Sequence, residues 1–226
     1  MEELIRLNGI SVKYRITTEA PKTLQDLVLQ CLKGRKSQLQ DFWALRDVSL
    51  SLPKGARLGI IGVNGSGKST LLKVIAGIIK PSEGEARVNG VIAPLIELGA
   101  GFDFELTGIE NIYLNGSILG LSKKEIDGKL RNILDFSELD SFIHSPLRSY
   151  SSGMIARLAF SIAVEVNADI LIVDEVLSVG DAGFRRKCQK KIDEIIGAGT
   201  SLLFVSHSLS DVQQLCNTAL WLDKGR

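Results

Sequence analysis

The eight residues GVNGSGKS, from Gly62 to Ser69, have the types and the spacing of a phosphate-binding loop. Glycines let the backbone curl around a phosphate with its N–H groups pointing inward, Lys68 neutralises phosphate charge, and the Ser69 hydroxyl suits Mg²⁺. The loop follows an apolar strand pattern and precedes a helical one, which is the context that the motif requires. A turn without a ligand would need neither the lysine nor the hydroxyl, so we favour a phosphate site. Its predicted nucleotide-binding residues are Gly62, Asn64, Gly65, Ser66, Gly67, Lys68, Ser69 and Thr70.

Two carboxylates, Asp174 and Glu175, come directly after four apolar residues that are typical of a buried strand. Acids at strand ends are usual at α/β active sites, because ligands bind beyond the carboxyl ends of parallel strands. We predict that Asp174 holds Mg²⁺, directly or through water, and that Glu175 orients or deprotonates an attacking water. A solvated acidic turn is the alternative, and the phosphate-binding loop upstream favours the catalytic interpretation.

His207 follows the next apolar strand pattern, at the same end of the predicted sheet. A histidine there can reach a γ-phosphate or hold the Glu175 water in place, whereas the simpler interpretation is a residue at a helix start beside Ser206 and Ser208. Taken alone, the residue favours the simpler interpretation. With the other motifs we assign it to catalysis, together with Lys68 and Glu175.

The five residues YSSGM, from Tyr150 to Met154, open an apolar segment with a helical pattern. A serine at a helix start caps free backbone N–H groups. The same N–H groups and hydroxyls can instead bind a phosphate, since a helix N-terminus is an anion site. These five residues do not decide between the two interpretations.

The elements that must position these residues alternate along the chain. Strand patterns over 4–16, 48–52 and 57–61 give a small N-terminal β region, and an amphipathic helical pattern lies within 21–41. From Lys68 onward helices and buried strands take turns, which predicts a mostly parallel sheet with helices on its faces. We therefore predict an α/β fold: a P-loop NTPase core, an N-terminal antiparallel β subdomain and an inserted α-helical subdomain over about 106–165. The elements expected after Lys68 are helices to 76, within 107–121, 123–136, 182–196 and 208–216, a helix after YSSGM that runs to 166, and strands over 170–173, 201–205 and 219–222.

Composition narrows the class of protein. The 226 residues are 45% hydrophobic, which is enough for a sizeable core, and 27 basic residues balance 26 acidic ones, so no global field favours nucleic acid or an anionic membrane. The three cysteines are far apart and lack metal-ligand spacing, which favours reduced thiols over a disulfide or zinc framework. Neither a signal peptide nor a membrane-spanning run is visible, so we expect a soluble chain.

In their order along the chain, these motifs resemble the ATP-binding cassette family of transport ATPases. YSSGM stands in the place of the family's LSGGQ signature, 178–181 in the place of its D-loop, and His207 in the place of its switch histidine. The resemblance covers essentially the whole chain and implies ATP and Mg²⁺ as ligands. It also implies a head-to-tail homodimer, in which each ATP lies between the phosphate loop of one copy and the signature of the other. Ser151, Ser152 and Gly153 then bind nucleotide.

Two residues depart from the family pattern. Glu97 stands near the position of the family's glutamine, where a carboxylate can bind Mg²⁺ or water but cannot donate a hydrogen bond when ionised. Ser152 replaces a glycine, and its side chain would resist a positive φ. For the adenine, the family places an aromatic residue at the end of the first strand, which matches Tyr14; Trp43 is a rival platform, and either ring can instead pack the β region.

The nearer resemblance is to the ATPase subunits of bacterial exporters of lipid-linked polysaccharides such as O-antigen, teichoic acid and capsule, on residues 42–48, 92–102, 106–116 and 150–154. It implies a peripheral ATPase on the cytoplasmic face of the cytoplasmic membrane, with an integral membrane transport subunit as partner, polysaccharide cargo handled indirectly and no nucleic acid. We expect one cassette over 1–226, continuing beyond Arg226, with segment 21–32 contacting either the membrane subunit or its own β region. The alternatives are a soluble cassette ATPase not coupled to transport and a P-loop kinase or GTPase; the chain lacks a guanine-reading Asn-Lys-x-Asp run.

Overall fold

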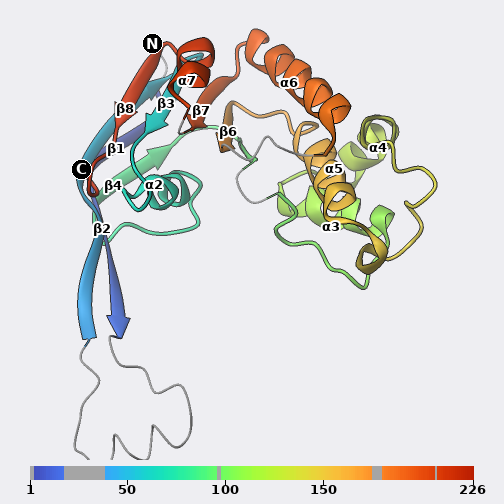
Figure 1. Cartoon of the computed structure of the whole chain (residues 1–226), viewed down its shortest axis with the longest axis horizontal. Helices are drawn as coiled ribbons and strands as arrows, with labels where there is room; N and C mark the ends of the chain where they lie inside the picture. Colours follow the sequence, from blue (N-terminus) through green and yellow to red (C-terminus); the bar gives the residue numbers. More distant parts are fainter. Residues whose placement is uncertain (1–2, 18–38, 96–97, 175–179, 207) are drawn as a thin grey trace, which may run out of the picture. The chain divides into compact units, whose positions relative to one another are not determined.

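The computed structural model describes residues 3–17, 39–95, 98–174, 180–206 and 208–226 (Figure 1). By their internal contacts they divide into two units. The larger unit comprises residues within 1–5, 51–61 and 88–221, and the smaller unit comprises residues within 6–50, 62–87 and 222–226. The predicted helix within 21–41 falls outside the described residues, except at 39–41, which are strand rather than helix.

The larger unit is built on a five-stranded sheet in the order β5-β6-β7-β3-β8, in which every neighbouring pair is parallel. Sequence neighbours are therefore joined by crossovers that carry helices, as the alternating pattern predicted. In the register, Asp174 pairs with Val205 and Val205 pairs with Ile60, so the carboxyl ends of β6, β7 and β3 lie level. The strands are β3 Arg57–Ile61, β5 Ile92–Pro94, β6 Ile170–Asp174, β7 Ser201–Val205 and β8 Thr218–Trp221.

Helices of the larger unit form around this sheet and in a helical lobe. In the lobe α3, α4 and α5 pack against one another (Figure 1). Both α3 and α4 begin with a capping box, formed by Thr107 with Glu110 and by Ser122 with Glu125, which satisfies the first free N–H groups of each helix. The helices are α3 Gly108–Ile118, α4 Lys123–Ser137, α5 Ser152–Ala163, α6 Ala182–Gly197 and α7 Leu209–Leu215, with a 3₁₀ turn η1 at Leu147–Ser149.

One hydrophobic cluster runs through the larger unit, from the sheet into the helical lobe. It includes Leu171 and Leu202 of the central strands, Ile112 and Ile133 of the lobe, and Phe160, all at most 1% exposed. Because the lobe shares this core with the sheet, the start of α5 is held by packing as well as by local hydrogen bonds.

The smaller unit holds a three-stranded antiparallel sheet in the order β2-β1-β4 and the helix α2. Two of its strands are long and lie side by side (Figure 1). The sequence predicted only 48–52 for the second of them, because its first residues are polar; there Lys13 pairs with Asp41 at 3.1 Å. The elements are β1 Glu3–Thr17, β2 Leu39–Pro53, β4 Glu83–Val88 and α2 Lys68–Ile75.

Two short strands were not predicted from the sequence. β4 alternates charged and small residues, and four of its six residues are exposed; β5 has only three residues. Both are ordered by their neighbours in a sheet rather than by their own apolar pattern. In the part of the chain that the structure describes, no helix is long and apolar enough to cross a membrane.

Candidate nucleotide-binding site

The loop between β3 and α2 has the backbone that a phosphate cradle requires. Gly65 and Gly67 have φ angles of 77° and 105°, a region that side chains rarely adopt. Gly67 is the N-cap of α2, and a Cβ atom placed on it would lie 2.6 Å from the carbonyl oxygen of Ala44. Both the conformation and the close approach therefore demand glycine at position 67.

Lys68 is 7% exposed, and its ammonium group is turned back into the loop. Its Nζ donates to the carbonyl oxygens of Gly62 at 2.8 Å and Val63 at 3.0 Å. These two carbonyls hold the positive charge at the centre of the loop. A phosphate oxygen is a stronger acceptor than a neutral carbonyl, so the ammonium group can exchange them for a bound anion.

The N-terminus of α2 is left open. No side chain caps it, and its first turn holds no acidic residue, so neither a hydroxyl nor a carboxylate of the helix competes for its free N–H groups. Beside it, the Ser66 hydroxyl is buried without a hydrogen-bond partner among the described residues. An uncapped helix end with an unsatisfied buried hydroxyl fits the oxygens of a phosphate group.

The turn 223–226 is hydrogen-bonded to this loop. The Gly225 N–H donates to the carbonyl oxygen of Ser66 at 2.9 Å, and the Arg46 N–H donates to the carbonyl oxygen of Gly225 at 2.7 Å. A Cβ atom on Gly225 would lie 2.7 Å from the Ala44 carbonyl oxygen. The turn 223–226, which we call the clasp, thus ties the phosphate loop to β2. This role was not predicted from the sequence, although a glycine after Asp-Lys is typical of a turn.

Of the residues predicted beyond the carboxyl ends of the central strands, the structure describes Asp174. Asp174 ends β6 and is half-buried. Glu97, Glu175 and His207, with residues 178–179 of the predicted D-loop, lie outside the described residues, so their assigned roles stay predictions.

The donor set for a cation is small. Among the described residues, no three His, Cys, Asp or Glu side chains gather as a metal site. Nucleotide-bound Mg²⁺ needs only one or two protein ligands besides phosphate oxygens and water. Ser69 of the smaller unit has an exposed hydroxyl and Asp174 of the larger unit a carboxylate; each is a hard oxygen ligand of the kind that this ion prefers, so each fits it by its chemistry.

The YSSGM segment begins α5 as a capped helix. Ser151 is the N-cap in an extended conformation, and its Oγ accepts the Met154 N–H at 3.2 Å. Ser152 is the first helical residue and is not among the described residues with positive φ. The conflict expected between a side chain at position 152 and a positive φ therefore does not arise in this structure, because the helical backbone accepts serine. Both serines are exposed.

Tyr150 anchors this helix start. Its ring is 8% exposed, burial raises the pKa of its hydroxyl, and the hydroxyl donates to the carbonyl oxygen of Phe142 at 2.8 Å. A Cβ atom on Gly108, the first residue of α3, would lie 2.5 Å from the Tyr150 hydroxyl. The tyrosine is thus a structural residue that positions the two serines, a role that the sequence alone did not reveal.

Two asparagines of α3 fix the loop that follows position 97. Asn111 is fully buried; it donates to the carbonyl oxygens of Asp103 and Thr107, each at 2.9 Å, and accepts the Asp103 N–H at 2.8 Å. Asn115 donates to the carbonyl oxygen of Ala100 at 2.9 Å. Two asparagines four residues apart in a helical pattern were the sequence signal for this role, which was not predicted.

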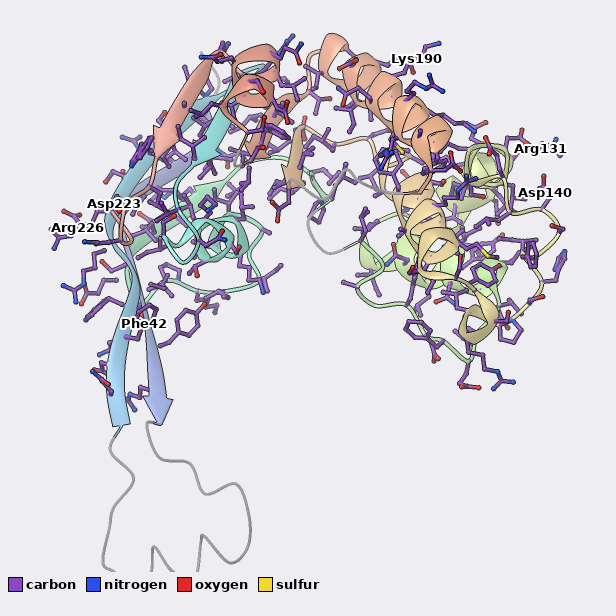
Figure 2. All side chains as sticks on the ribbon, viewed as in Figure 1. Phe42, Arg131, Asp140, Lys190, Asp223 and Arg226 are labelled. Carbon is purple, nitrogen blue, oxygen red and sulfur yellow. The ribbon has the colours of Figure 1, made fainter. Side chains whose placement is uncertain are left out.

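Both aromatic candidates for the adenine lie in the smaller unit. Tyr14 on β1 is 38% exposed. The Trp43 ring already has Lys13 Nζ 5.3 Å and Arg46 Cζ 5.5 Å from its centroid. Trp43 also lines a pocket of about 580 Å³ with residues of β2 and of the clasp, among them Phe42, Asp223 and Arg226 (Figure 2).

Three comparisons with known proteins place the chain among relatives. Residues 45–178 match the family model described as ABC transporter. The chain is 44% identical over its full length to the O-antigen export system ATP-binding protein RfbB of Klebsiella pneumoniae, and spans 92% of that protein. It is 40% identical over its full length to the teichoic acids export ATP-binding protein TagH of Bacillus anthracis, and spans 40% of that protein. A solved structure of the ATP-binding cassette MJ0796, a dimer bound to ADP and Pi, superposes with a TM-score of 0.74 at 21% identity, covering 98% of this chain and 95% of the other.

Proposed function

Because the chain belongs to the ABC transporter family of ATP-binding subunits, we propose that it is the ATP-hydrolysing subunit of a bacterial exporter of lipid-linked polysaccharide, of O-antigen, teichoic acid or capsule type. The observation that carries the proposal is 44% identity, over the whole chain, to an ATP-binding protein named for O-antigen export. The open, glycine-built loop at the start of α2 supports the ATPase part of it.

In this proposal the loop from Gly62 to Thr70 binds the phosphates of ATP. Its N–H groups and the uncapped end of α2 surround the phosphate oxygens, and Lys68 exchanges its two carbonyl partners for the β- and γ-phosphates. Ser69 and Asp174 hold Mg²⁺, with Glu97 as a further candidate ligand. When bound, the ion neutralises phosphate charge.

Hydrolysis is assigned to two residues outside the described ranges and to Lys68. Glu175 accepts a proton from the attacking water or orients it, and His207 contacts the γ-phosphate or the same water. Lys68 stabilises the charge that develops on the γ-phosphate oxygens. For the adenine we keep Tyr14, because its ring is exposed, whereas the ring of Trp43 already lies beside two cations.

The second half of each site is assigned to a second copy of the chain. Ser151, Ser152 and Gly153 would then bind the γ-phosphate held by the partner's loop. Among the residues that the structure describes, a Cβ atom on Gly153 would meet only the Ser151 hydroxyl, at 3.8 Å, so these residues leave the face above the helix start open to a ligand. We assign the remaining contacts to an integral membrane subunit, on the cytoplasmic face of the membrane, with the cargo handled by that subunit.

The test has two parts. Hydrolysis of Mg-ATP by the purified chain should rise more than linearly with protein concentration, and Lys68→Ala should abolish it. Expressed with the exporter's membrane subunit in a strain lacking its own ATPase, the wild-type chain should restore polysaccharide at the cell surface, and Lys68→Ala should not. ATP hydrolysis without any restoration would favour the alternative of a cassette ATPase not coupled to transport. Strictly linear hydrolysis would contradict the dimeric site.

A further inference from the structure

Arg157 lies in the second turn of α5 and joins three helices through one side chain. The side chain is only 18% exposed. Its Nη1 donates to the Glu138 carboxylate at 3.0 Å, and its Nη2 donates to the Asp181 carboxylate. Its guanidinium carbon lies 4.7 Å from the centroid of the Phe184 ring. One residue of the helix begun by YSSGM is thus bonded to the end of α4 and to the beginning of α6.

Both carboxylates belong to residues at helix ends. Asp181 is the N-cap of α6 and accepts the N–H groups of Gly183 at 2.8 Å and Phe184 at 3.0 Å, and the bond from Phe184 is the largest reason why the pKa of Asp181 is lowered. Glu138 is the C-cap of α4, with a φ of 57°. Because two backbone N–H groups hold the Asp181 carboxylate in place, its bond to Arg157 depends on the position of α5 relative to the start of α6.

A second basic residue, Lys187, also bonds α6 to the end of α4. Lys187 of α6 donates to the Glu138 carboxylate at 2.8 Å and to the carbonyl oxygen of Phe136, in the last turn of α4, at 2.9 Å. The bond from Lys187 is also the largest cause of the lowered pKa of Glu138. Lys187 therefore joins α4 to α6 without Arg157. The contribution of Arg157 is to connect α5 to both of these helices.

Beneath these charges lies an aromatic layer that excludes water from one side. The rings of Phe136, Phe160 and Phe184, one each from α4, α5 and α6, have centroids 5.7 to 6.3 Å apart. A Cβ atom on Gly180 would lie 3.2 Å from the Phe184 ring and 3.5 Å from Arg157 Nε, so the residue before Asp181 is also packed against the arginine. Only a planar guanidinium can stack on a ring and bridge two carboxylates at once.

We propose that Arg157 is a positioning residue, which locks the start of α5 to the start of α6 so that Ser151–Gly153 and the first turn of α6 move as one body during ATP turnover. The inference rests on the proposed function, since the first of these segments is assigned to the partner's ATP and the second follows the strand that ends at Asp174. The phosphate loop is not part of this lock. Removing the Arg157 lock should therefore reduce ATP turnover without weakening the binding of ATP to the isolated chain.

The experiment compares Arg157→Met, Arg157→Lys and Asp181→Asn with a matched control, Arg131→Met. Arg131 is an exposed arginine of α4 (Figure 2), and it forms an ion pair with Asp135 one turn further along the same helix. Fluorescent ATP-analogue affinity, kcat, KM and the thermal unfolding midpoint are measured for each. We expect Arg157→Met to lower kcat at least about tenfold with analogue affinity and KM within about twofold, because a displaced helix start misplaces the groups that it carries. Arg157→Lys should keep the fold but recover little turnover, and Arg131→Met should match the wild type.

The double variant Arg157→Met with Asp181→Asn should turn over ATP no more slowly than the slower single variant, since each substitution removes the same bond between Arg157 and Asp181. An unchanged kcat in Arg157→Met, or a loss of kcat no larger than the loss of folded protein, would overturn the inference. If the wild-type chain itself hydrolyses no ATP, the proposed function fails and the lock is judged by hydrogen exchange instead. Arg157→Met should then speed exchange in the first turns of both α5 and α6, and faster exchange in only one of them would contradict the lock.

Discussion

The N-termini of α2 and α5 are both assigned to phosphate binding, but they differ in whether a side chain caps their free backbone N–H groups. α2 begins at Gly67, in a left-handed conformation and without a side-chain cap. α5 begins at Ser151, in an extended conformation, and the Ser151 hydroxyl accepts one of the free N–H groups of the helix. Around α2 the glycines are required by backbone angles and close contacts, whereas Gly153 in α5 is required by neither.

The contrast indicates how the two ends depend on a ligand. Uncapped N–H groups, a buried hydroxyl without a partner and a lysine turned onto neutral carbonyls leave α2 with polar groups that an anion would satisfy. The start of α5 is complete within one chain, because capping, the anchored Tyr150 and the hydrophobic core hold it. The contrast supports the proposal that α2 carries the resident nucleotide site and that α5 is a preformed surface for a nucleotide bound by another copy of the chain.

Removing the charge at α2 should have the largest effect. Lys68→Ala should lower ATP turnover by about 100-fold or more, since a charge aimed at the phosphates in a water-poor site has no substitute. Steady-state ATP hydrolysis measures it, with Lys80→Ala, an exposed lysine after α2, as the control. Turnover close to that of the wild type would contradict the assignment of α2 as the nucleotide site.

The two glycines should respond in opposite ways to the same substitution. Gly67→Ala should lower the free energy of unfolding by about 1 to 3 kcal/mol, because alanine resists the positive φ and its Cβ meets the Ala44 carbonyl. Gly153→Ala should leave stability unchanged or raise it by up to about 1 kcal/mol, as alanine favours a helix. We expect turnover to fall in both variants. Urea denaturation with an activity assay separates them, and equal destabilisation would remove the contrast.

Ser151 allows capping and phosphate binding to be separated. Ser151→Ala should lower the free energy of unfolding by about 0.5 to 2 kcal/mol through loss of the cap. Ser151→Asp keeps a capping oxygen and should retain stability, but its charge would repel a γ-phosphate and reduce turnover. Ser152→Gly serves as the control for stability at this helix start. Normal turnover by the aspartate variant would mean that Ser151 is only a cap.

Low pH should lower the stability of the helical lobe through the capping boxes of α3 and α4, whereas α2 has no capping box. A bond from the Thr107 N–H lowers the pKa of Glu110, and a bond from the Ser122 hydroxyl lowers that of Glu125, from an ordinary value of 4.5. A carboxylate whose pKa is lower in the folded state stabilises the fold above the unfolded value, and this stabilisation is lost as the pH falls through the folded pKa.

Glu110→Gln should therefore be less stable than the wild type near pH 6, and the two should converge as the pH falls below about 4. Urea midpoints across this range measure the small difference, with the exposed Glu194→Gln of α6 as the control. Parallel curves for the wild type and Glu110→Gln would show that the capping box contributes no acid sensitivity.

Local patterns in the sequence were enough for most elements and for the phosphate loop. The apolar strands around Leu171 and Leu203 and the Gly-x-x-x-x-Gly-Lys-Ser run carry their own signals, because a buried strand and a phosphate cradle are specified by adjacent residues. The long strand β2 was only partly predicted, since the ion pair of Asp41 with Lys13 joins residues far apart in the sequence. The roles of Gly225, Asn111 and Arg157 depend on such distant contacts, and no local pattern contains them.

The clasp sets an order of events when the chain is made. A ribosome releases Ser66 long before Gly225, the residue that supports it from below. A growing chain that has not reached Gly225 therefore carries its phosphate-loop sequence without the hydrogen bond that ties this loop to β2. We expect ATP to assist the folding of chains in which the clasp has left the ribosome and not of shorter nascent ones.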